Sequence, residues 1–433
     1  MRHAAILLAL FIATPALGDE VRTFMGTLNG REILVELTDP KSGPGVGRYT
    51  FKDAGGDVPL LAVSQDGNAF TLHEEAPCDE TTCKTDDEGK AVDPPLGAVW
   101  ELTYDPEEYI ATGTRATLDG KPKAADLTLE VLAWRDLDSS ETLTPFGLHD
   151  RSAALGFDDG AALDWGAAPY EMSLLEVEFD EAPEQRLGEA TFRDVTDPRT
   201  KFAFPRVTAF ADGAPADKVN AILSERHGRM NLSAFDCLAF RYATYGKGEY
   251  MGSMGGTLGD YDGELVTLSY ASPKLVSWVQ SGSLWCTGAH PYNHIDSYTF
   301  DVETGEPLDL AQVFSAWVPR EWGAAVDEVA DAEAAAANPD AYFWGPSFGL
   351  IAYVRDNIPS DLFDAELASE CINPQAIAEN LDIRFSERDA VTFTLSGFPH
   401  VISVCNGDLF SAPLDEVKQF LGKGAAEYFP GIL

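Results

Sequence analysis

The sequence predicts an α+β protein in which an N-terminal all-β antiparallel barrel or sandwich precedes a domain with an antiparallel sheet and several helices. Three observations support this fold class. A chain of 433 residues exceeds what one core usually organises, short alternating runs fill its first third, and helical spacings join strands in its second half. We place the boundaries at residues 1–18 for a signal peptide, 19–136 for a β-meander domain, 137–199 for a connecting region and 200–433 for the α+β domain.

The first 18 residues are typical of an export signal peptide cleaved after Gly18. A basic start at Arg2 precedes the apolar run Ala4–Ala13 and a group of small residues. The apolar run is shorter than the roughly 20 residues of a spanning helix, and Pro15 would interrupt it. Asp19 stands where a lipoprotein would carry its cysteine. We therefore expect a soluble periplasmic or extracellular protein without membrane insertion.

The chain is strongly acidic, with 71 Asp and Glu against 30 Lys and Arg and a formal net charge of −41. Loss of Arg2 with the signal peptide changes this charge to −42. Such a surface repels nucleic acid and anionic membranes, and it attracts a cationic partner. The composition alone favours a simpler interpretation, in which acidity keeps an exported protein in solution.

The cysteines form an even set of six: Cys78, Cys83, Cys237, Cys286, Cys371 and Cys405. In an oxidising compartment an even set predicts three disulfides. Spacing pairs the first two as a local clip. For the other four, which allow three connectivities, we adopt Cys237 with Cys286 and Cys371 with Cys405. A zinc site is the alternative, but it usually needs paired close spacings, and only one short spacing occurs.

Strand periodicity extends from about Arg22 to Trp134. The alternating runs are Glu32–Leu37, Gly47–Phe51, Leu60–Val63, Ala69–His73, Val99–Tyr104, Ile110–Ala116 and Leu127–Trp134. Turn sequences such as Asn29-Gly30 separate them and favour antiparallel hairpins. About seven strands make a small barrel or sandwich.

The rest of the chain mixes helix and strand signals. Residues Asp136–Asp197 contain only brief strand-like pieces and are predicted to connect the domains. Predicted helices then span Ala216–Met230, Leu310–Phe314, Trp322–Ala337, Ser347–Asn357, Asn373–Ala378 and Leu414–Leu421. Predicted strands span Leu265–Tyr270, Lys274–Gln280, Ser283–Thr287, Ser297–Asp301, Leu381–Phe385, Val391–Leu395 and His400–Cys405.

One stretch of the second half carries a family resemblance. Its distinctive part is Gly288-Ala289-His290-Pro291, followed by a Tyr-x-Phe-Asp-x-x-Thr-Gly segment that begins at Tyr298. This layout resembles the extracytoplasmic module shared by the lysozyme-sensing anti-sigma factor of sigma V and a peptidoglycan deacetylase of Gram-positive bacteria. The pieces Phe204-Pro205-Arg206-Val207 and Phe398–Cys405 extend the resemblance over roughly residues 200–425.

The resemblance implies a binding module, because in one branch of the family the module binds a muramidase. We find no counterpart of the anti-sigma members' transmembrane helix or of the deacetylases' catalytic domain, so neither signalling nor deacetylation is implied. The candidate binding residues lie at the Gly-Ala-His-Pro step and just after it: Gly288, His290, Pro291, Tyr292, Asn293 and His294.

His290 and His294 form an H-x-x-x-H pattern, which on a helix would place two imidazoles on one face as metal ligands. The neighbouring Gly288 and Pro291 instead indicate a turn between two strands, without the Glu of a zinc hydrolase. This favours a structural role for His290. We predict no catalytic residue, no metal and no cofactor.

Weaker motifs are short or incomplete. Phe157-Asp158-Asp159-Gly160 resembles the aspartate pair of carbohydrate deacetylases, but it is only four residues long. Asp260–Glu264 begins like a calcium loop whose glycine position is taken by Leu265. Gly252–Gly255 lacks the first glycine of a nucleophile elbow. The tryptophans that would stack on sugars if exposed are Trp278, Trp285, Trp317, Trp322 and Trp344.

Three functions remain in view. The first is a non-enzymatic module that binds either a muramidase or a cell-wall component. Muramidases such as lysozymes are often cationic, so an acidic protein would attract them. The second is a metal-dependent hydrolase of peptidoglycan or glycans that uses His290, His294 and either Asp296 or Asp158. The third is binding of a small apolar ligand inside the N-terminal β-domain. The sequence does not predict an oligomeric state.

Overall fold

The structure is a computed structural model. It describes residues 20–38, 45–77, 84–85, 91–93, 95–118, 124–137, 144–157, 160–239, 241–242, 264–284, 292–387 and 389–432. The predicted signal peptide lies outside these residues.

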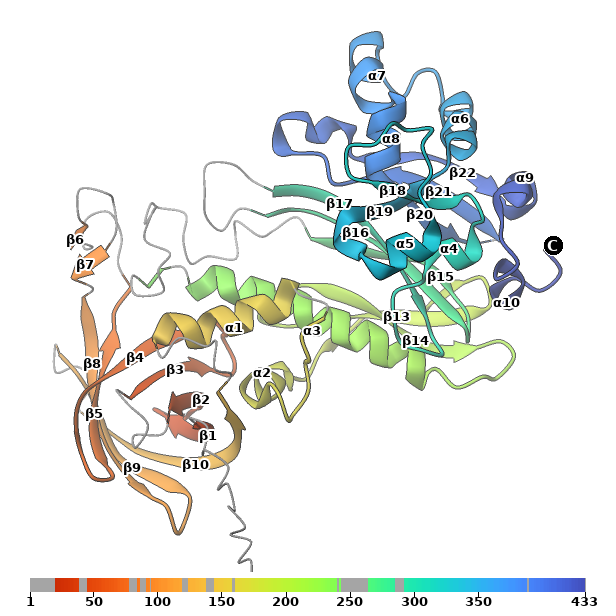
Figure 1. Ribbon diagram of the computed structural model, residues 1–433. Coiled ribbons are helices and arrows are strands. Elements are labelled where there is room, and N and C mark those ends of the chain that lie inside the picture. Colours follow the sequence, from red (N-terminus) through yellow and green to blue (C-terminus); the bar gives the residue numbers. More distant parts are fainter. Residues whose placement is uncertain are drawn as a thin grey trace, which may run out of the picture.

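Eight antiparallel strands close into a barrel (Figure 1). This confirms the predicted N-terminal β-domain and shows that it is a barrel rather than a sandwich. Its order around the barrel is β1-β10-β9-β8-β5-β4-β3-β2. The strands are β1 (Glu20–Leu28), β2 (Arg31–Thr38), β3 (Val46–Phe51), β4 (Val58–Asp66), β5 (Ala69–Glu75), β8 (Leu96–Asp105), β9 (Ile110–Thr117) and β10 (Ala125–Asp136). Each of the seven predicted runs lies within one of them. Two short strands, β6 (Lys84–Thr85) and β7 (Ala91–Asp93), pair outside the barrel.

The turn between β1 and β2 requires two residues that tolerate a left-handed backbone conformation. Asn29 and Gly30 have φ values of 53° and 81°, so both occupy the left-handed region that a two-residue hairpin requires. Asparagine and glycine are the residues that adopt this conformation at the least cost. The predicted antiparallel hairpin is therefore confirmed.

The barrel interior is filled by side chains. Trp100, Tyr49 and Phe70 are buried there, and the indole Nε1 of Trp100 donates to Glu74 at 2.7 Å. Tyr242, which follows the long helix α3 (Asp217–Ala239), packs into the same core. The helix end thus contributes to the barrel core.

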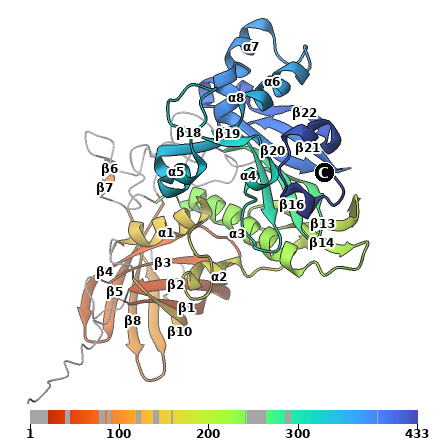
Figure 2. The same ribbon diagram turned by 45° about the vertical axis from the view of Figure 1, so that its right-hand side comes forward.

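Two further helices, α1 (Pro145–Phe157) and α2 (Pro169–Leu175), lie between the barrel and the remaining sheets, with α1 alongside α3 (Figures 1 and 2). They fall in Asp136–Asp197, where the prediction of only brief strand-like pieces is wrong. The reason is that the buried positions of these helices include His149, Ser152 and Glu171, so no continuous apolar stripe marks them.

The described residues from Asp180 onward form four antiparallel sheets, as expected for an α+β domain. They are formed by β11 (Asp180–Glu181), β12 (Gln185–Leu187), β13 (Ala190–Thr196) and β14 (Ala203–Phe210); by β15 (Leu265–Ala271), β16 (Leu275–Leu284) and β17 (Tyr292–Asp301); by β18 (Trp317–Glu321) and β19 (Tyr342–Pro346); and by β20 (Leu381–Ser386), β21 (Ala390–Leu395) and β22 (Gly407–Pro413). The helices are α4 (Leu310–Val313), α5 (Ala332–Ala337), α6 (Phe348–Asn357), α7 (Ala365–Cys371), α8 (Pro374–Asn380), α9 (Leu414–Val417) and α10 (Ala425–Tyr428), with 3₁₀ turns η3 (Pro339–Ala341), η4 (His400–Cys405) and η5 (Lys418–Phe420).

Several predicted elements differ from the structure. The helix predicted over Trp322–Ala337 is confined to α5, because Gly323 adopts a φ of 83° and Asp331 caps a later start. The strand predicted over His400–Cys405 is the 3₁₀ turn η4, which follows Pro399. The strands predicted over Lys274–Gln280 and Ser283–Thr287 are not separate, because β16 (Leu275–Leu284) runs from the first into the second; residues 285–287 lie outside the described residues.

One predicted disulfide is confirmed, since Cys371 and Cys405 are bonded and join the end of α7 to η4. Cys237 is also disulfide-bonded, and no described cysteine is free. The predicted partner Cys286 and the predicted pair Cys78 and Cys83 lie outside the described residues. Within the described part of the chain, no helix is both long and apolar enough to cross a membrane.

Candidate functional site

The candidate binding residues belong to the connection between β16 and β17 and to the start of β17. These strands pair antiparallel, with Gly282 opposite His294. Gly288, His290 and Pro291 lie outside the described residues. Tyr292, Asn293 and His294 are the first three residues of β17, so His294 is part of a strand rather than of the turn.

His294 is held between two carboxylates. Its Nδ1 lies 2.8 Å from Oδ2 of Asp296, and its Nε2 lies 2.8 Å from Oε1 of Glu264. Gln280 of β16 donates to the other oxygen of Glu264 at 3.1 Å. Gly282 leaves space for this arrangement, since a Cβ there would come within 2.6 Å of Glu264 Oε1 and 2.9 Å of His294 Nε2. We name Glu264, His294 and Asp296 the β17 histidine cluster.

The two carboxylates keep the imidazole charged. Desolvation alone would lower the pKa of His294, but hydrogen bonds and negative charge from Asp296 and Glu264 raise it to about 9. At neutral pH both ring nitrogens therefore donate, and neither has a lone pair for a metal or for an incoming proton. In this arrangement His294 is unsuited to the ligand or base role that a metal-dependent hydrolase would give it. Asp158 and His290 lie outside the described residues.

An acidic groove lies where β12–β14, β15 and the turn between β20 and β21 meet. It has a volume of about 450 Å³, and Tyr270 and Phe210 form part of its apolar wall. The carboxylates that line it are Glu189, Asp212, Glu387 and Asp389, and its described lining contains no basic side chain. Arg388 in the same turn lies outside the described residues. A concave site with apolar walls and several carboxylates suits a lysine or arginine side chain, which has an apolar stem and a cationic end.

The groove is held by contacts between distant segments. The backbone N–H of Gly188 donates to Oε1 of Glu387 at 3.1 Å, which joins the turn after β12 to the turn after β20. Asp389 has a φ of 52°, a conformation that aspartate and asparagine tolerate better than most residues. Burial and then the negative charge of Asp389 raise the pKa of Tyr270. Nothing in the sequence pattern indicated this groove, because its acids come from three turns that lie far apart in the sequence.

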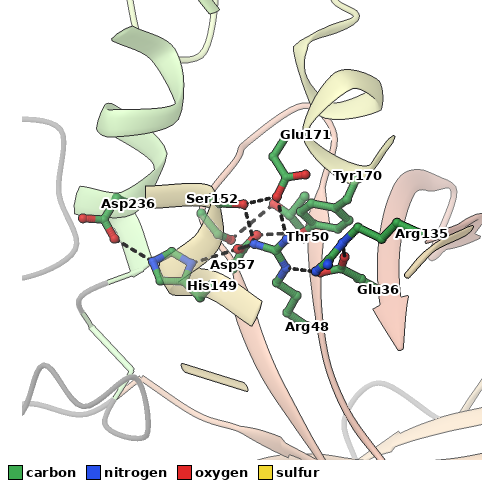
Figure 3. Close-up of polar contacts among 11 residues, drawn as sticks. Glu36, Arg48, Thr50, Asp57, Arg135, His149, Ser152, Tyr170, Glu171 and Asp236 are labelled. Atoms are coloured by element: carbon green, nitrogen blue, oxygen red, sulfur yellow. Dashed lines mark hydrogen bonds and ion pairs between the residues drawn. The ribbon is translucent and has the colours of Figure 1, made fainter. Parts of the chain in front are cut away.

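A second group of charged residues is buried outside the barrel, beneath α1 and α2. Figure 3 shows Arg48 of β3 surrounded by polar partners. Its Nε donates to Glu36 at 2.7 Å, its Nη1 to Asp57 at 2.9 Å and its Nη2 to Glu171 at 2.6 Å. Ser152 of α1 also accepts from Nη1 at 2.5 Å. We name these five residues the Arg48 network.

His149 of α1 extends this network to α3. Its Nδ1 lies 2.9 Å from Oδ2 of Asp57 and its Nε2 lies 2.6 Å from Oδ1 of Asp236 (Figure 3). Burial by itself would raise the pKa of Asp57, but Arg48, His149 and Tyr170 hold it well below its ordinary value. The carboxylate therefore stays charged and joins the barrel to α1 and α2, which is a structural role.

The tryptophans that would stack on sugars if exposed differ in their exposure. Trp278 is fully buried against Phe204 and Phe300, so it belongs to the core. Trp322 is 65% exposed and packs on Phe343 with ring centroids 4.8 Å apart. Trp344 is also exposed, Trp317 is partly buried, and Trp285 lies outside the described residues.

The chain was also compared with known proteins. It matches no model of a protein family, and no curated protein matches it.

Proposed function

We propose that this chain is an exported, non-enzymatic protein that binds a cationic muramidase. The observation that carries the proposal is the acidic groove, whose described lining has four carboxylates and no base. The formal charge of −41 supports it, because a strongly acidic protein attracts a basic partner and steers its approach. The resemblance of residues 200–425 to a muramidase-binding module points to the same class of partner.

The β17 histidine cluster favours binding over catalysis. A base or a metal ligand needs a free lone pair, and both nitrogens of His294 are occupied by carboxylates. The barrel offers less support for a small-ligand function, because Trp100, Tyr49 and Phe70 occupy its interior.

Titration calorimetry of the chain without residues 1–18 against a cationic lysozyme tests the proposal. We expect a Kd in the micromolar range or lower at about 20 mM salt, weakening at least tenfold at about 300 mM salt because screening reduces the attraction. Absence of heat at the lower salt concentration would refute it. Binding of soluble peptidoglycan fragments without binding of the lysozyme would show that the ligand is a cell-wall component instead.

A matched pair of variants locates the surface. Glu387→Gln with Asp389→Asn keeps the shape of the groove and removes two charges, and we expect binding to weaken about tenfold. Glu107→Gln with Glu108→Gln removes two charges from an exposed turn of the barrel, where we expect less than about a twofold change. Equal effects of the two double variants would show that only the total charge matters.

A further inference from the structure

A second cavity lies between α2, α3 and β14. It has a volume of about 360 Å³ and a largely apolar wall that includes Leu163, Met172, Leu175 and Phe179. One basic residue, Arg206 of β14, lines it. The combination of an apolar wall and a single cation distinguishes this cavity from the acidic groove.

Arg206 is held by neutral acceptors. Its Nη1 donates to the carbonyls of Pro205 at 2.9 Å and Leu223 at 3.4 Å, and its Nη2 lies 3.1 Å from Nδ1 of His227. The guanidinium also lies 5.9 Å from the ring centre of Phe179. These contacts fix the position of the side chain without neutralising its charge.

His227 supports this position as a neutral ring. It stacks between Phe179 and Phe204, with centroid distances of 5.0 and 5.5 Å. Burial, with a smaller effect from Arg206, lowers the pKa of His227 to about 3. Its Nε2–H therefore donates to the carbonyl of Phe202 at 3.2 Å, which leaves Nδ1 to accept from Arg206.

Arg206 has no carboxylate partner among the described residues, although the chain contains 71 acidic residues. Two carboxylates line the same cavity, but Glu225 is bound to Arg229 at 2.7 Å and Glu176 is exposed. Burial lowers the pKa of Arg206 to about 10, so the group remains charged at neutral pH. A partly buried cation without a carboxylate partner carries a desolvation cost that an anionic ligand would offset.

We propose that this cavity binds a monoanionic amphiphile, in which a carboxylate pairs with Arg206 and an apolar body contacts Leu163, Met172 and Leu175. The single guanidinium matches one negative charge. A dianion such as a phosphate monoester would be disfavoured, because Glu176 and Glu225 lie on the same lining. The fork of the guanidinium is suited to a carboxylate, since both are planar and pair through two hydrogen bonds.

Calorimetry with decanoate, decanol and decylammonium, three probes with the same chain and different charge, tests this proposal on the unmodified protein. We expect saturable binding of decanoate with a Kd at least about tenfold lower than that of decanol, and no saturable binding of decylammonium. Equal affinity for decanoate and decanol, or no saturable decanoate binding up to about 1 mM, would overturn it.

Two variants assign the effect to the cavity. Arg206→Gln should weaken decanoate binding at least about tenfold and bring it to the level of decanol, with circular dichroism confirming the fold. Lys218→Gln removes a cation from the exposed start of the same helix α3 and should leave the Kd within about twofold. Loss of affinity in both variants, or in neither, would contradict the assignment to Arg206.

Discussion

Replacement of His294 by glutamine tests the charge state of the β17 histidine cluster. The pKa of His294 is raised from an ordinary 6.5 to about 9, so the folded state favours the protonated ring. At 1.36 kcal/mol per pH unit this corresponds to about 3 kcal/mol, and we expect about 2–3 kcal/mol because Asp296 is 31% exposed and its charge is screened. This stabilisation is complete below pH 6.5 and is lost as the pH rises through 9.

Urea unfolding of both proteins between about pH 6 and pH 10 measures this contribution. At each pH we compare the free energy of unfolding of the native chain with that of His294→Gln. The difference between the two proteins should be about 2–3 kcal/mol larger at about pH 6 than at about pH 10. His73→Gln is the control, since the side chain of His73 on β5 forms no hydrogen bond or ion pair within the described part of the chain. A difference between the native chain and His294→Gln that stays constant over this range would refute the reasoning.

Two further predictions concern stability. Arg48→Met leaves three buried carboxylates without their shared cation, so we expect a loss of about 3–5 kcal/mol in urea unfolding, against less than about 1 kcal/mol for the exposed Arg31→Met. A loss below about 1 kcal/mol for Arg48→Met would contradict this. Gly55→Ala places a Cβ 2.2 Å from the ring of Phe235 at a φ of 71°, and we expect thermal unfolding to show a loss of at least about 2 kcal/mol. Gly67→Ala has a similar φ but open space, so a comparable loss there would refute the steric argument.

The barrel was predictable because most of its strands alternate between buried and more exposed residues. Residues such as Phe70 and Leu72 point inward while their neighbours are more exposed, and this alternation is visible in the sequence. Strand β2 departs from it, since Leu34 and Glu36 are buried on the outer face under other elements. The helices that cover them could not be recognised, because their buried faces mix apolar residues such as Leu155 with polar ones such as Ser152 and Glu171.

The candidate sites were predictable only where their residues are neighbours in the chain. His294 and Asp296 are two positions apart, so a strand places both on one face. Glu264 lies 30 residues away and meets His294 only through the pairing of three strands. The missing counter-ion of Arg206 is likewise a property of the folded chain, since acidic residues are abundant throughout the sequence.

Helix α3 has a consequence for the unit in which this protein unfolds. Val219 and Ile222 on its first turns complete the core of the sheets, Phe235 packs under the barrel, and the chain just after it places Tyr242 in the barrel core. Separation of the two halves at any point near this helix would expose apolar surface on both. We therefore expect no protease-sensitive hinge at α3 between the barrel and the sheets. We also expect both parts to unfold in one cooperative transition.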